Sequence, residues 1–102
     1  MFWVLDASLA GLSRAERGVL AAAYNVANLN TEGFRARRPD GSPRRPDAGA
    51  PAAVKPDDSR ASDVDLAEEL VELKHHAVAC RASAAVVRSA HGTLGAWLDL
   101  LP

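Results

Sequence analysis

The chain has 102 residues, of which 48% are hydrophobic but only 5% aromatic, and its formal net charge is -1. This length favours one folded unit, and because much of the apolar share is alanine, a helical seam is expected rather than a thick globular core. The balanced charge excludes a general attraction to nucleic acid or anionic membranes, and a single cysteine, Cys80, excludes an intramolecular disulfide.

The first predicted element is an amphipathic helix from about Trp3 to Asn28, within an N-terminal region of residues 1–34. Its apolar side chains recur at helical spacing on one face, at Leu5, Leu9, Leu12, Val19, Ala23 and Val26. Gly11 and Gly18 each lower the helix propensity by roughly 1 kcal/mol. The helix should end in an asparagine-rich turn at 28–33. Asp6 interrupts the apolar stretch at the N-terminus, which is therefore too short for the apolar core of a cleaved secretory signal.

Residues 35–62 differ in composition and predict a disordered or extended linker. Five of the six prolines lie here, together with the arginines Arg35, Arg37, Arg38, Arg44 and Arg45. Proline removes backbone donors and disfavours helix in the residue before it. The arginines could contact phosphates, but no aromatic residue after Phe34 is available to stack on bases, so a solvated linker is favoured and nucleic-acid binding is not expected. Substitution of Arg44 is accordingly expected to have little effect.

Residues 63–102 contain the strongest pattern of the chain, an unbroken four-three spacing that predicts a coiled-coil helix. The seam positions are Leu66, Leu70, Leu73, Ala77, Cys80, Ala84, Val87, His91, Leu94, Leu98 and Leu101. Asp65 is the expected N-cap, with Glu68 three residues on as in a capping box. The predicted fold is therefore all-α, with two long helices in a helical hairpin or coiled coil and a Pro/Arg-rich flexible linker. Pairing within one chain and pairing between chains both satisfy the pattern.

No catalytic, cofactor or metal site is expected. His75, His76 and Cys80 are the only metal-like grouping, and a closed zinc site needs about four ligands. A cysteine on the seam is expected to be buried, which disfavours nucleophilic catalysis. No apolar stretch reaches the roughly 20 residues of a membrane-spanning helix, so membrane insertion is not expected either. Two paired helices without a third layer leave apolar surface in water, which indicates a partner or self-association.

Several stretches resemble segments of one family, two of them its terminal motifs. NVANLNTEGFRA, from Asn25 to Ala36, is similar to the asparagine-rich N-terminal signature of bacterial flagellar rod and hook axial proteins, and the preceding helix is similar to the one that leads into it. SDVDLAEELVEL, from Ser62 to Leu73, resembles the family's C-terminal opening, and residues 86–100 resemble its closing helix. PDGSPRRP, from Pro39 to Pro46, resembles a loop of the short proximal rod proteins, which are the nearest subgroup.

The resemblance implies a structural subunit of the flagellar basal-body rod that assembles by coiled-coil packing of its terminal helices. Its expected partners are other axial proteins, further copies of itself and the flagellar export apparatus, which would export it to the rod without a cleaved signal peptide. The expected assembly residues are Leu5, Leu9, Leu12, Val19, Asn25, Asn28, Asn30, Leu66, Leu70, Leu73, Val87, Leu94 and Leu98. The alternative is a diverged, non-structural module that docks on axial proteins or the export apparatus and regulates assembly. The short middle segment and the loss of a polar signature at 77–83 favour that alternative.

Overall fold

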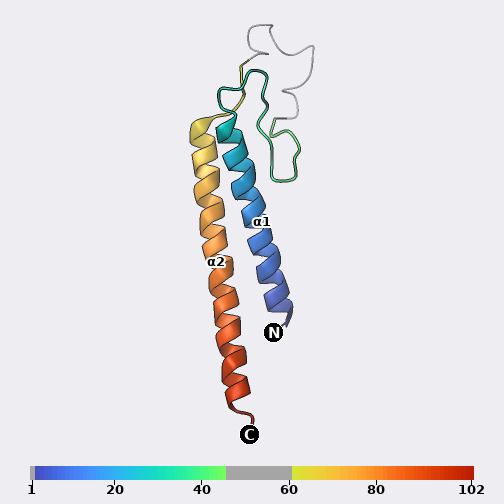
Figure 1. Ribbon diagram of the computed structural model, residues 1–102, viewed down its shortest axis with the longest axis vertical. Helices are drawn as coiled ribbons and strands as arrows, with labels where there is room; N and C mark the ends of the chain where they lie inside the picture. Colours follow the sequence, from blue (N-terminus) through green and yellow to red (C-terminus); the bar gives the residue numbers. More distant parts are fainter. Residues whose placement is uncertain (1, 46–60) are drawn as a thin grey trace.

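The computed structural model describes residues 2–45 and 61–102, which form a thin helical hairpin. Helix α1 (Phe2–Ala27) and helix α2 (Leu66–Asp99) run antiparallel, with both chain ends at the same end of the molecule (Figure 1). The molecule extends 74 × 20 × 14 Å, so it is a single layer of two helices that pack mainly against each other. The predicted all-α helical hairpin is confirmed, and the two helices pair within one chain.

Both helix boundaries follow from local chemistry. The Asp65 carboxylate accepts hydrogen bonds from the backbone amides of Ala67 and Glu68, which confirms it as the N-cap of α2. At the other helix, α1 ends at Ala27, and the Tyr24 carbonyl near its end accepts from both the backbone amide (3.2 Å) and the side-chain amide (2.9 Å) of Asn28. The chain then turns through residues 28–34.

The line of contact on α1 differs from the predicted seam by about one residue. The most buried residues of α1 are Ser8, Ala15, Gly18, Ala22 and Asn25, which keep the four-three spacing. The larger Leu5, Leu12, Val19 and Val26 lie beside this line and are half-buried, whereas Leu9 and Ala23 are exposed. The physical reason is that small side chains let the two helix backbones approach closely, and the larger residues then flank the contact.

The first part of the predicted linker, residues 35–45, is folded against the helices. The backbone amide of Arg38 donates to the Ser42 carbonyl (2.8 Å) and that of Arg44 to the Ala36 carbonyl (2.8 Å), so the strand-like arms of a tight loop face each other. Gly41 supplies the positive φ of 87° that this loop needs. The expectation of a disordered or extended linker therefore does not hold for 35–45, because local backbone hydrogen bonds replace the missing apolar anchors. Residues 46–60 of that prediction lie outside the described part of the chain.

Neither α1 nor α2 carries an apolar stretch long enough to cross a lipid bilayer.

Candidate assembly surface

The two sequence motifs that carry the family resemblance meet at the closed end of the hairpin. Asn25, from the first motif, has no exposed surface and uses its whole side-chain amide. Its Nδ2 donates to the Arg37 carbonyl (3.0 Å) and to Glu69 Oε1 (3.1 Å), while its Oδ1 accepts from the Arg37 backbone amide (2.9 Å). Asn25 therefore joins α1, the loop and α2.

Glu69, from the second motif, is also fully buried, and it contacts both Asn25 and an arginine of the loop. Arg44 forms an ion pair with Glu69 through Nη1, and its Nη2 lies 3.4 Å from Glu69 Oε2. A charge out of contact with water needs both a counter-charge and hydrogen bonds, and Glu69 has both. The expectation that Arg44 belongs to a solvated linker is wrong, because its side chain is the counter-charge of a buried carboxylate.

Exposed ion pairs and backbone contacts surround the buried pair. Arg45 Nη2 lies 2.6 Å from Glu68 Oε2, and its Nη1 donates to the Asp63 carbonyl (2.8 Å). Glu68 thus pairs with arginines of the loop, in addition to its place in the first turn of α2. Asp63 in turn accepts from the buried backbone amide of Ala36 and donates its own amide to the Phe34 carbonyl (3.3 Å). We call Asn25, Arg44 and Glu69, with the loop backbone that they hold, the head knot.

Below the head knot the two helices keep one register along their whole contact. Seven residues before Asn25, a Cβ on Gly18 would lie 2.4 Å from the His76 imidazole, and seven residues further back a Cβ on Gly11 would lie 3.0 Å from Ser83 Oγ. Each step of seven residues down α1 is matched by seven residues along α2, from Glu69 to His76 to Ser83. The glycines make room for larger side chains of α2.

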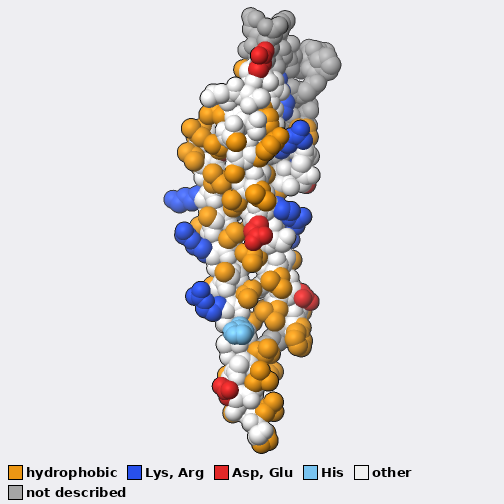
Figure 2. All heavy atoms as spheres, viewed as in Figure 1, with side chains coloured by type: hydrophobic (Ala, Val, Ile, Leu, Met, Phe, Trp, Pro, Cys, Tyr) orange, Lys and Arg blue, Asp and Glu red, His pale blue; other side chains and the backbone are white. Residues whose placement is uncertain are grey.

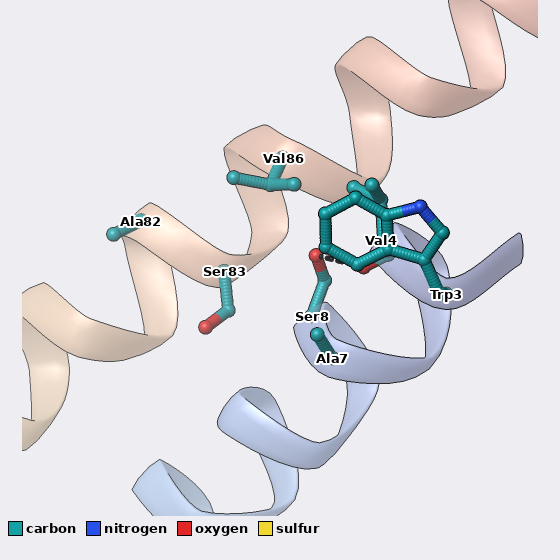
Figure 3. Close-up of a pocket in the computed structure, with 7 residues that line it drawn as sticks. All are labelled: Trp3, Val4, Ala7, Ser8, Ala82, Ser83 and Val86. Atoms are coloured by element: carbon teal, nitrogen blue, oxygen red, sulfur yellow. Dashed lines mark hydrogen bonds between the residues drawn. The ribbon is translucent and has the colours of Figure 1, made fainter. Parts of the chain in front are cut away.

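The same contact continues near the start of α1, where small side chains face each other. Figure 3 shows Ala7 and Ser8 of α1 opposite Ala82 and Ser83 of α2, at a shallow hollow of about 380 Å³. Ser8 is buried and its hydroxyl donates to the Val4 carbonyl (2.7 Å), which satisfies it within its own helix. Trp3 and Val86 border the hollow.

A flank of α2 carries apolar side chains that α1 does not cover. Leu66 is 43% and Leu70 is 54% exposed, although both belong to the predicted four-three seam. Ala77, which is half-buried, and Ala84, which is exposed, follow Leu70 at intervals of seven residues, so they lie on the same side of the helix. We call Leu66, Leu70, Ala77 and Ala84 the outer stripe. Across the face seen in Figure 2, hydrophobic side chains likewise remain open to solvent along the whole rod.

The predicted assembly residues therefore divide into three groups. Asn25 is in the head knot, and Leu73 and Val87 are half-buried at an interval that follows the contact with α1. Leu94 is also half-buried, at the point where this contact ends. A second group flanks that contact or remains exposed: Leu5, Leu9, Leu12, Val19, Leu66, Leu70 and Leu98. Asn28 bonds to Tyr24 and Thr31 at the end of α1, and Asn30 is exposed. The structure thus separates residues that build the hairpin from residues that are left for contacts outside it.

His76 packs against α1, whereas His75 and His91 are exposed. The His76 ring lies against Gly18, and its Nε2 is 3.2 Å from Glu72 Oε2. The His75 ring meets that of His76 edge-on at 5.4 Å, and Cys80 is a half-buried free thiol. Within residues 2–45 and 61–102, no three histidine, cysteine or carboxylate side chains come together as a metal would require.

The sequence patterns do not predict several residues of the site. The small residues Ser8, Gly11, Ala15, Gly18 and Ala22 already show four-three spacing in the sequence, but a search for large apolar side chains passes over them. Arg44 and Glu69 are 25 residues apart, and no local pattern links them.

Comparison of the chain with protein-family models, with curated proteins and with solved structures finds no match to any of them.

Proposed function

We propose that this chain is a structural subunit of the bacterial flagellar basal-body rod, which assembles through its outer stripe with the helices of neighbouring axial proteins. The role is architectural rather than catalytic, and the partners are other axial subunits and further copies of the chain. On this proposal the chain reaches the rod through the flagellar export apparatus.

The observation that carries the proposal is the meeting of the two family-like motifs in the head knot. Asn25 and Glu69 are 44 residues apart in the sequence, yet they are hydrogen-bonded and both fully buried. In a rod subunit the two terminal motifs are expected to belong to one paired unit, and the contact of Asn25 with Glu69 supports this reading of the resemblance.

The packing supports an assembly role independently of the resemblance. The residues of α1 that α2 covers are mostly small, and the large leucines of both helices remain half-buried or exposed. Apolar side chains at regular spacing along a rod are the surface that further helices cover in a bundle. The outer stripe offers such a surface along the first half of α2.

The experiment is to tag the chain in its bacterium, purify detergent-extracted hook–basal bodies, and wash them with high salt. Retention of the tagged chain after the wash is expected, because apolar helix packing is not weakened by salt screening. Complete loss from the basal bodies, in cells that require the gene to swim, would instead support the docking or regulatory module. An irrelevant tagged cytoplasmic protein of similar size serves as the control for carry-over.

A further inference from the structure

The far end of α2 extends beyond α1 and carries a second apolar surface. The register that pairs Gly11 with Ser83 brings Val4, near the start of α1, beside Ala90 and Thr93, so no described residue of α1 lies opposite the last turns of α2. Trp97, Leu98 and Leu101 are each at least 60% exposed in this part. We call residues 94–101 the overhang. Leu94, Trp97, Leu98, Leu100 and Leu101 line a hollow of about 440 Å³ on it.

The overhang also has a distinct charge. No lysine or arginine follows Arg88, and Asp99 is the only carboxylate side chain after that point. In Figure 2 the lower end of the molecule is accordingly free of lysine and arginine on the face shown, and hydrophobic side chains cover much of it. The overhang is therefore an apolar segment with a single negative side chain.

A groove of complementary character lies on the side of α1 near the head knot. It has a volume of about 420 Å³ and lies between α1 and the loop at 37–41, which runs beside α1 in Figure 1. Leu20, Tyr24 and Pro39 form apolar walls, and Leu20 and Tyr24 are 68% and 52% exposed. Arg17, Arg37 and Arg38 complete the lining. We call this the head groove.

The arginines of the head groove retain positive charge for a ligand. Arg37 and Arg38 donate to the carbonyls of Gly41 and Arg44, both at 3.3 Å, which positions their guanidinium groups without neutralising them. Arg17 makes no ion pair with any described residue. The nearest carboxylate in the loop is Asp40, which accepts from the Ser42 hydroxyl (2.6 Å) and amide (2.8 Å), contacts that hold the pKa of Asp40 below its usual value. Because the loop contains only one carboxylate, the positive charges of the three arginines outnumber its negative charge.

We propose that the overhang of one copy binds in the head groove of a second copy, with its apolar side chains against Leu20 and Tyr24 and Asp99 facing the arginines. The overhang cannot reach the groove of its own chain, because the two lie towards opposite ends of a rod 74 Å long. The match of an apolar, acidic segment to an apolar, cationic groove favours a second copy over a nucleic acid, whose phosphates would leave Leu20 and Tyr24 in water. This inference rests on the proposed function, for which it supplies a contact between copies.

The contact is head to tail, so it has a direct consequence for assembly. Each copy would offer one overhang and one head groove, and an interface between two different patches can repeat without closing. Because the groove lies on the side of α1, successive copies overlap laterally in a staggered row. Such a row has a direction, as an axial structure needs.

Cysteine cross-linking tests the pairing of the two patches. Two full-length variants are made in a Cys80→Ser background, one with Leu20→Cys in the groove and one with Leu98→Cys on the overhang. Mixing them under mild oxidation should give mainly the mixed disulfide. A product dominated by Leu98→Cys homodimers would overturn the proposal in favour of a tail-to-tail contact, and a product no more abundant than with an exposed control cysteine at His75 would overturn it entirely.

A charge exchange tests the chemistry of the same contact by sedimentation equilibrium of the full chain. Asp99→Lys and the double variant Arg37→Glu/Arg38→Glu should each weaken self-association several-fold at low salt, and an equimolar mixture of the two should recover most of it. The matched control is Arg81→Glu on the exposed side of α2, which alters neither patch and should therefore self-associate as the natural chain does. Unchanged association of both charge variants would refute the interface. Their retention in washed basal bodies alongside that result would leave the rod proposal standing, so the two proposals fail separately.

Discussion

At the scale of single residues, the head knot depends on one buried carboxylate and the arginine that balances it. Glu69 has no exposed side-chain surface, whereas its partner Arg44 keeps 15%. Removing one partner of a buried ion pair leaves the other charge without compensation, which costs far more than the pair itself contributes. The neighbouring pair of Arg45 with Glu68 is exposed by 43% and 37%, and a solvent-exposed pair of this kind contributes little.

We therefore predict that Arg44→Ala lowers the free energy of unfolding by about 3 kcal/mol, whereas Arg45→Ala lowers it by less than about 1 kcal/mol. Urea unfolding followed by circular dichroism measures both changes. Adding Glu69→Gln to Arg44→Ala should recover part of the loss, because it removes the stranded charge. Equal losses for the two arginine variants would show that Glu69 is not held by Arg44 in solution.

At the scale of the helices, close approach at glycine sets the register. A Cβ added at Gly18 meets the His76 ring, but one added at Gly92, on the exposed side of α2, meets no atom within 4 Å. Both positions are helical, so both substitutions gain the intrinsic preference of alanine over glycine, about 1 kcal/mol. Only the substitution of Gly18 also brings a new methyl group into contact with a neighbouring side chain, that of His76.

We predict that Gly18→Ala is destabilising by about 1 kcal/mol, because overpacking against His76 outweighs the gain in helix propensity. In a His76→Ala background the same substitution should instead stabilise the hairpin by about 1 kcal/mol, and Gly92→Ala should stabilise the natural chain by a similar amount. Thermal unfolding of the four variants completes the comparison. A Gly18→Ala effect that is the same with and without His76 would contradict the register.

The sequence predicts the helices better than it predicts their contact. The absence of proline before residue 39, the cap at Asp65 and the four-three spacing of α2 are local signals, and they yield both helices and the hairpin. The contact line on α1 is set by the small side chains, whose advantage appears only once a second helix lies against them. The contacts that hold the loop at 35–45 against the helices, such as the pair of Arg44 with Glu69, join residues far apart in the sequence, and no spacing rule reaches that far.

At the scale of the whole molecule, the hairpin has very little core. The buried hydrophobic residues of the described ranges are Ala15, Ala22, Ala36, Val64 and Ala90, and the largest fully buried side chains are polar, those of Glu69 and Asn25. A rod with so little large apolar surface buried gains little from the hydrophobic effect. Much of its stability is expected to come from contacts with neighbours.

We accordingly predict that the isolated chain melts over a broad temperature range and that its Tm rises with protein concentration. Self-association stabilises the folded state by mass action, so a concentrated sample should unfold at a higher temperature than a dilute one. Circular dichroism at two concentrations a hundredfold apart measures this. A sharp melt at the same temperature in both samples would indicate that the hairpin is stable alone.

The outer stripe links the architecture to the proposed role, and one pair of variants isolates it. Leu70 is 54% exposed and is not needed for the contact with α1, so Leu70→Asp should leave the hairpin folded while placing a charge in the stripe. His75 is also exposed and lies roughly 140° further round α2, so His75→Asp adds a negative charge away from the stripe.

The most direct measurement is the retention of these two tagged variants in salt-washed hook–basal bodies, relative to the natural chain. We predict that the natural chain and His75→Asp are retained and that Leu70→Asp is lost, although its circular dichroism spectrum is unchanged. Retention of Leu70→Asp at the natural level, or absence of the natural chain itself from the washed basal bodies, would contradict the account.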